Sequence, residues 1–263
     1  SLLDEGQLLP HSLVEDVPTV INGYHPQNFN LKHVGAVPAS KALSRSLNVP
    51  AVRLLREYGL QKFYNKLHKM KMKSLDRPSS YYGLSLILGG AESSLWEVTS
   101  TYASIASSLN YFSAHSSTYR TKEFTEATYL QNESKDFGEE QFDPLVLGAG
   151  AIFGTFHSMY EVNRPDGDEN WRFFDSSQPI AWKTGTSFGF KDAWAVGVTP
   201  KYAIGVWAGN ADGEGRPGLT GITAAAPLLF DVLDALPNSG WFQEPFDDLI
   251  EIEVSSTGIF GCF

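Results

Sequence analysis

The chain has little cysteine and little positive charge, and each shortage excludes a class of function. Cys262 is the only cysteine in 263 residues, which excludes a disulfide framework and a zinc or iron–sulfur site built on several cysteines. The 20 lysines and arginines are outnumbered by 30 aspartates and glutamates, which gives a net charge of −10. Such a chain repels phosphate on average, so we expect no nucleic-acid partner.

Long hydrophobic runs are also missing. No stretch of 18 apolar residues occurs, so the sequence predicts no membrane-spanning helix. The 6 histidines show no paired metal-ligand spacing, and we expect neither a metal nor another cofactor. What is present, 42% apolar and 19% charged residues, is typical of a globular protein. The length suits one large domain or two small ones.

Helical patterns dominate residues 1–178. A candidate helix covers residues 38–47, and a second covers 50–58 and is closed by Gly59. A third covers residues 60–71. These short helices predict a mainly helical first part of the chain.

Two longer helices are predicted farther along. The string Ser94-Leu95-Trp96-Glu97 is a capping-box pattern, and it opens a helix that we expect to end near residue 109. Asp143 and Pro144 suit an N-cap and a first turn, and they predict a helix to about residue 160. In the first of these helices, the apolar residues at helical spacing should face a core: Leu95, Val98, Tyr102, Ile105 and Leu109.

The character of the sequence changes after residue 178. Residues 179–186, 192–198 and 202–208 are short, rich in β-formers and separated by turn-sized gaps, which predicts an antiparallel meander. Residues 221–236 suit a helix packed on that sheet, and residues 247–254 alternate as a strand should. Helices followed by a sheet and a closing helix indicate the α+β class.

The sharpest motif is the string Lys183-Thr184-Gly185-Thr186, at the end of a predicted strand. A lysine ammonium beside threonine hydroxyls suits a substrate carboxylate. Glycine leaves room for a substrate against the strand, and a backbone N–H at such an edge can donate to a developing oxyanion. The string therefore predicts a strand edge that binds a carboxylate and stabilises an oxyanion.

A second pattern, Ser-x-Asn, occurs twice. Ser46-Leu47-Asn48 lies in a turn between two predicted helices, where catalytic side chains are often presented. Ser108-Leu109-Asn110 lies at the predicted end of a long helix, where serine and asparagine suit a C-terminus. Context therefore favours the first copy as functional.

Glycines at 148 and 150 loosely match a dinucleotide-binding loop. Such a loop needs its glycines before a helix, whereas the predicted helix has already begun at Pro144. Close helix packing is the better interpretation of Gly148 and Gly150.

Together, Ser46-Leu47-Asn48 and Lys183-Thr184-Gly185 resemble two of the three motifs of the penicilloyl-serine transferases, which are Ser-x-x-Lys, Ser-x-Asn and Lys-Thr-Gly. The resemblance implies the fold of penicillin-binding proteins and serine β-lactamases, an antiparallel sheet flanked by helices plus an all-helical region. Three further strings are similar to the transpeptidase domain of class A penicillin-binding proteins: Leu88-Gly89-Gly90-Ala91-Glu92, Lys191-Asp192-Ala193-Trp194 and Gly205-Val206-Trp207-Ala208-Gly209-Asn210.

One motif of the family is missing. No Ser-x-x-Lys occurs in the 263 residues, and Ser187 has Lys191 four residues on rather than three. In the family this tetrad lies on a helix shortly before a segment like the one at 2–9. We therefore expect the nucleophile to lie upstream, the domain to be N-terminally truncated, and this chain alone to be inactive.

The resemblance implies peptidoglycan D,D-transpeptidase chemistry without a cofactor. A serine attacks the D-alanyl-D-alanine carbonyl of a stem peptide, D-alanine leaves, and an amine of a second stem peptide resolves the acyl-enzyme; β-lactams are trapped as acyl-enzymes. Ser46 would relay a proton toward the leaving amine, Asn48 would bind the substrate amide, and Lys183 would keep the site positive. Thr186 would supply an oxyanion N–H and, with Thr184, bind the carboxylate. The implied substrate-binding residues are Thr184, Gly185 and Ser187.

The resemblance also implies a setting. Residues 1–240 would be a truncated transpeptidase domain, with a mainly helical part to 178 and a sheet with its closing helix from 179. Residues 241–263 would begin a C-terminal β extension. The parent protein would be periplasmic and anchored to the inner membrane.

Two alternatives remain open. A serine β-lactamase or β-lactam sensor shares the fold and the motifs but hydrolyses or only reports the antibiotic. A non-catalytic cell-wall scaffold or binding module would carry Ser46 and Lys183 as relics.

Overall fold

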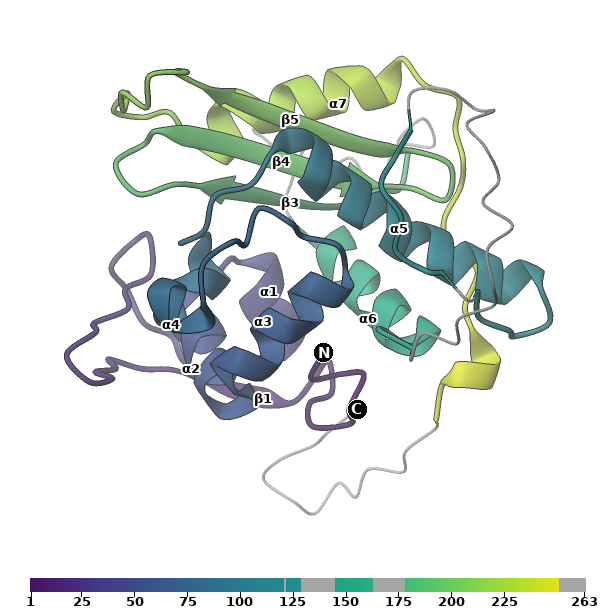
Figure 1. Cartoon of the computed structure of the whole chain (residues 1–263), viewed down its shortest axis with the longest axis horizontal. Coiled ribbons are helices and arrows are strands. Elements are labelled where there is room, and N and C mark those ends of the chain that lie inside the picture. The colour runs from purple at the N-terminus through teal and green to yellow at the C-terminus, as the bar shows by residue number, and fades with distance from the viewer. Residues whose placement is uncertain (121, 129–144, 163–177, 251–263) are drawn as a thin grey trace.

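An antiparallel sheet in the order β3-β4-β5 lies in the upper part of this computed structural model in the view of Figure 1. The structure describes residues 1–120, 122–128, 145–162 and 178–250. The register pairs Lys183 with Val196 and Trp194 with Trp207, which confirms the predicted meander. The strands are β3 (Ala181–Thr186), β4 (Asp192–Val198) and β5 (Ala203–Gly209).

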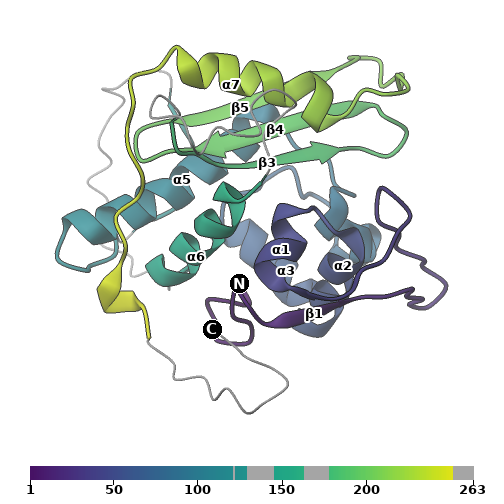
Figure 2. The same ribbon diagram turned by 180° about the vertical axis from the view of Figure 1, so that it is seen from behind.

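Helices cover both faces of this sheet (Figures 1 and 2). The alternation of β3 sends Trp182 to one side and Ala181 to the other, and each joins a separate apolar core. Trp182 packs with the helix that closes the sheet, a π-helical turn Gly221–Ala225 that leads into α7 (Ala226–Asp234). Ala181 packs with α5 (Leu95–Ala114) and α6 (Ala149–Tyr160). The predicted α+β class is therefore confirmed.

Most of the remaining helices gather beyond the β3 edge of the sheet (Figure 1). A hairpin of β1 (Leu13–Asp16) and β2 (Gly35–Pro38) pairs Val14 with Val37, and both side chains enter a small core with Ala42 and Leu47. The helices are α1 (Ala39–Ser44), α2 (Asn48–Tyr58), α3 (Leu60–Lys69) and α4 (Ser79–Tyr82), followed by a 3-10 helix Gly83–Leu88. The three short helices predicted in this region are confirmed.

Helix α5 begins as predicted but ends later. Ser94 caps it by accepting a hydrogen bond from the Glu97 N–H at 3.1 Å. The predicted end near residue 109 was wrong because Phe112, 3% exposed, continues the buried stripe by another turn. Leu95 was also wrongly placed in the core, since it is 37% exposed. No helix in the described ranges is long and apolar enough to cross a membrane.

Helix α6 begins at Ala149 after an N-cap at Gly148, so the predicted start at Asp143 and Pro144 was wrong. Those two residues lie outside the described residues, and 145–148 are not helical. Gly148 therefore precedes the helix, as a glycine of a dinucleotide-binding loop would, contrary to the prediction. The carboxylates of Asp4 and Asp248 fill the helix N-terminus, accepting hydrogen bonds from Gly148 N–H at 2.6 Å and Gly150 N–H at 2.8 Å. These two negative charges would repel a phosphate at that position.

The segment after residue 240 packs on the same domain. Phe242 is 4% exposed, and its ring lies 5.0 Å from that of Phe156 in α6. Residues Phe246–Asp248 form a 3-10 turn, so the predicted strand at 247–254 was wrong for its first residues. The rest of that strand lies outside the described residues. The domain boundary at 240 stays a prediction.

Gly221 lets the closing helix begin directly against β3. A Cβ there would lie 2.5 Å from the carbonyl oxygens of Gly185 and Trp194. We predict that Gly221→Ala lowers the free energy of unfolding by about 1–3 kcal/mol, because overpacking against backbone cannot be relieved by a rotamer change. Urea denaturation measures this loss.

Gly185→Ala is the matched control for Gly221→Ala. A Cβ at Gly185 meets nothing closer than the Trp194 Cβ at 3.6 Å. Its unfolding free energy should stay within about 0.5 kcal/mol of the parent chain. Equal losses in the two variants would show that close packing at Gly221 is not the cause.

Candidate active site

Lys183 in β3 contacts Ser46 in the turn between α1 and α2. Its Nζ donates a hydrogen bond to Ser46 Oγ at 2.5 Å and a second to the Thr184 carbonyl at 3.0 Å. The two residues lie 137 positions apart in the sequence. The structure therefore brings together the two motifs that sequence reasoning singled out.

The Lys183 ammonium is partly withdrawn from water. Burial lowers the pKa of Lys183 from its ordinary 10.5 to about 8. A lysine with this pKa still carries its charge in about nine-tenths of molecules at pH 7. It therefore acts at neutral pH as a fixed positive charge, with a small fraction in the neutral form.

The Ser46 turn is held in a conformation that few residues adopt. Ser46 has a φ of +57°, in the left-handed region. Ser46 N–H donates to the Leu43 carbonyl at 3.0 Å and Leu47 N–H to the Ala42 carbonyl at 2.9 Å, so the end of α1 holds the turn in shape. Asn48 follows as the first residue of α2 and is half-buried.

Thr184 and Thr186 lie on the opposite face of β3 from Lys183, because side chains alternate along a strand. Thr186 Oγ1 accepts a hydrogen bond from the Gly221 N–H at 3.0 Å. Its own hydroxyl hydrogen stays available to donate elsewhere. The N-terminus of the closing helix is here too, and its dipole favours an anion.

The outer edge of β3 carries main-chain groups directed away from the sheet. Among the described strands β3 pairs with β4 alone. Ser187 N–H donates to the Asp192 carbonyl at 3.0 Å, toward β4. Because successive N–H groups in a strand point in opposite directions, the Thr186 N–H points to the outer edge. Gly185 is exposed beside it.

The other predicted residues have local partners. Ser187 Oγ accepts from the Asp192 N–H at 2.8 Å inside the β3–β4 turn, and Asn48 Nδ2 donates to the Gln27 carbonyl at 2.9 Å. The second Ser-x-Asn lies within α5, where Asn110 Nδ2 donates to the Pro200 carbonyl at 2.7 Å. That copy is structural, in agreement with the sequence interpretation.

Sequence reasoning missed two residues of this site. Gly221 lies against the Gly185 carbonyl of β3. Thr220, directly before it, is the N-cap of the closing helix, and a threonine in that position is a pattern that the sequence offers. Asn28 contacts the N-terminus of α2, where its side-chain oxygen accepts from the Asn48 N–H at 2.9 Å. No local pattern could have found Asn28, because it lies 20 residues from its partner.

The depressed pKa makes Lys183 a cost to stability below pH 8. Below pH 8 the folded chain buries a charged ammonium. Between pH 8 and 10.5 the unfolded chain still binds a proton that the folded chain has released. The free energy of unfolding therefore rises with pH across this range. We predict that Lys183→Met is more stable than the parent chain at pH 7, that the gap narrows as the pH rises from 8, and that it closes above pH 10.5. Urea denaturation of both proteins across this range measures it; a gap that does not change with pH would contradict it.

No family model matches the chain, but curated proteins do. Over 238 residues it is 35% identical to penicillin-binding protein 1C of Escherichia coli (strain K12), covering 89% of this chain and 28% of that protein. Over 189 residues it is 29% identical to penicillin-binding protein 4 of Bacillus subtilis (strain 168), covering 71% of this chain and 28% of the relative. The chain thus spans less than a third of the length of these relatives.

Solved structures share the fold. The PonA1 protein of Mycobacterium tuberculosis in complex with penicillin V matches with a TM-score of 0.69 at 19% identity, over 92% of this chain and 67% of that one. The D,D-transpeptidase domain of a peptidoglycan glycosyltransferase from Eggerthella lenta matches with a TM-score of 0.61 at 13% identity, over 89% and 62%.

Three features of the sequence predict which relative the chain resembles most. Trp182 directly before Lys183, the string Ser187-Phe188-Gly189-Phe190 after it, and the string Ile87-Leu88-Gly89-Gly90-Ala91-Glu92 predict a particular likeness to penicillin-binding protein 1C. The 35% identity to that protein confirms the likeness. With the shared fold, these relatives show that the chain belongs to the penicillin-binding protein family.

Proposed function

We propose that this chain forms the substrate-binding part of a peptidoglycan D,D-transpeptidase. The main support for the proposal is the Lys183–Ser46 hydrogen bond. It places the strand that we propose to bind the substrate carboxylate beside a serine hydroxyl that could relay a proton. In this role Ser46 passes a proton toward the departing D-alanine amine. Lys183 keeps the site positive at neutral pH, which its pKa of about 8 supports.

The stem peptide's terminal carboxylate is proposed to bind at Thr184 and Thr186. Two hydroxyls on one face of β3, close to a helix N-terminus, support binding of an anion there. The outward Thr186 N–H suits one half of an oxyanion hole. Asn48 would hold the substrate amide, and exposed Gly185 would leave the strand edge open.

The nucleophile has to come from outside these 263 residues, because none of their serines belongs to a Ser-x-x-Lys tetrad. That serine would attack the penultimate D-alanine carbonyl, release D-alanine and leave an acyl-enzyme for an amine to resolve. The same chemistry would make β-lactams ligands of the whole protein. We further propose that the whole protein works in the periplasm, anchored to the inner membrane.

Recognition of the free carboxylate can be tested on this chain. We predict that a peptide ending in D-alanyl-D-alanine perturbs the amide resonances of β3, whereas its C-terminal amide does not, because the amide removes the charge that the threonines and helix dipole attract. Two-dimensional NMR titration reads this out. Equal binding of the two peptides, or no effect of Thr186→Val, would contradict the assignment of the carboxylate site.

Covalent reaction gives a separate test. We predict that incubation of this chain with a labelled penicillin yields no stoichiometric mass increase, because the chain has no Ser-x-x-Lys to supply an activated serine. Intact-protein mass spectrometry measures it. A one-to-one adduct would show that another serine of this chain is the nucleophile.

A further inference from the structure

The helix that carries Asn48 begins without a cap from its own sequence. The N-cap of α2 is Leu47, whose apolar side chain cannot accept a hydrogen bond. The first backbone N–H groups of a helix need acceptors, and leaving them without one destabilises the helix. The acceptor must therefore come from elsewhere in the fold.

Asn28, in the loop between β1 and β2, supplies that acceptor. Its Oδ1 accepts from the N–H groups of Asn48 at 2.9 Å and Val49 at 3.2 Å. Its Nδ2 donates to Asp16 Oδ1 at 2.7 Å and to the Lys32 carbonyl at 2.8 Å. The side chain is 2% exposed and makes all four hydrogen bonds that an amide can make.

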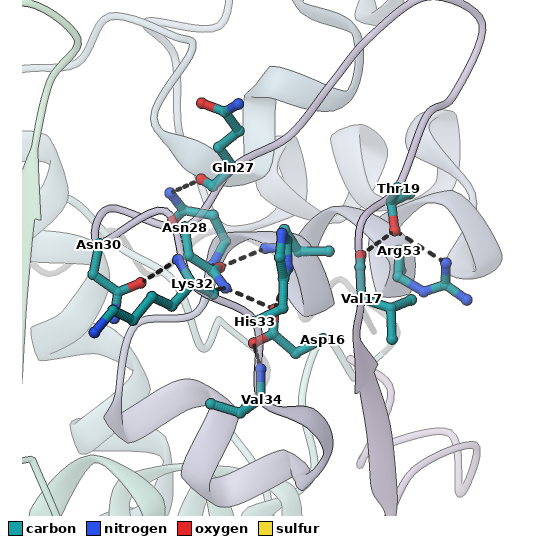
Figure 3. Close-up of polar contacts among 12 residues, drawn as sticks. Asp16, Val17, Thr19, Gln27, Asn28, Asn30, Lys32, His33, Val34 and Arg53 are labelled. Atoms are coloured by element: carbon teal, nitrogen blue, oxygen red, sulfur yellow. Dashed lines mark hydrogen bonds and ion pairs between the residues drawn. The ribbon is translucent and has the colours of Figure 1, made fainter.

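Asp16 fixes which way the Asn28 amide faces (Figure 3). Asp16 is 0% exposed, and its other oxygen accepts from the Val34 N–H at 2.9 Å. His33 Nδ1 lies 3.5 Å from its Oδ1. A carboxylate only accepts, so it takes the NH₂ end of Asn28 and turns the amide oxygen toward α2.

The same loop also holds the side chain of Asn48. Asn48 Nδ2 donates to the carbonyl of Gln27, next to Asn28, at 2.9 Å. Hydrogen bonds thus hold the three-residue turn Ser46-Leu47-Asn48 at both ends. Its start is bonded to α1, and its end is bonded to residues 27 and 28. Any shift of this loop moves the end of the turn.

We propose that Asn28 is a positioning residue that sets the Lys183–Ser46 contact by holding the first turn of α2, with Asp16 as its anchor. Its part in catalysis rests on the proposed function. The geometric claim does not, so it is tested here through Lys183 rather than through turnover.

The test follows the Lys183 ammonium by NMR during a pH titration of the whole chain. Asn28→Asp keeps an acceptor for α2 but sets a carboxylate against Asp16, so the turn should release and Lys183 should meet water. We expect the pKa of Lys183 to rise by about 1 pH unit toward the ordinary lysine value. Asn30→Asp is the matched control: it adds the same charge to the same loop and keeps its acceptor bond from Lys32 N–H.

A double exchange separates geometry from charge. Asp16→Asn with Asn28→Asp keeps the net charge of the parent chain and restores a donor facing an acceptor between positions 16 and 28, although the Lys32 carbonyl still loses the Asn28 donor. We expect it to reverse at least half of the Lys183 shift caused by Asn28→Asp alone. A folded Asn28→Asp that titrates like the parent, an equal shift in Asn30→Asp, or a folded double variant shifted as far as Asn28→Asp would each overturn the proposal.

A measurement on the unaltered chain covers the case in which the variants fail to fold. If Asn28 holds the turn, the amides of Asn48 and Val49 should resist hydrogen exchange at least tenfold more than an uncapped first helical turn. Exchange at the rate of free amides would overturn the proposal, whatever the variants do.

Discussion

The site depends on one lysine side chain that crosses from the sheet to the helical region. Lys183 gives up part of its hydration to reach Ser46, and the lowered pKa records the cost of that step. Without this contact, the strand and the turn would be two unrelated polar surfaces. The chain therefore keeps a destabilising charge where it is chemically useful, a compromise common at functional sites.

Support for that contact is built into the neighbouring elements on both sides. Gly221 allows a helix N-terminus to lie against β3, where any side chain would strike two carbonyl oxygens. On the Ser46 side of the contact, Asn28 and Asp16 hold the start of α2 through buried hydrogen bonds. Half-satisfied buried polar groups are expensive, so such a network resists small rearrangements. Rigidity of this kind keeps the strand and the turn in one relative geometry, which suits a site that must position a reacting group.

Sequence reasoning located the strands, the closing helix and both motifs because their signals are local. The Lys183 strand alternates and is followed by a short turn, and Ser94 is an N-cap that needs no distant partner. It failed where a distant partner decides the outcome. Helix α6 begins at Ala149 because Asp4 and Asp248 accept from its first N–H groups, and both lie about 100 or more residues away in sequence. The capping of α2 by Asn28 could not be predicted for the same reason, because the two lie in different parts of the sequence.

The shared use of that helix end has a mechanical consequence. Asp4 and Asp248 accept from the N–H groups of Gly148 and Gly150, two residues apart, so the first and last parts of the described chain are joined at the start of α6. A pulling force applied at residues 4 and 248 would act first on these two hydrogen bonds. Strand β3, which carries Lys183, would bear no load until they broke.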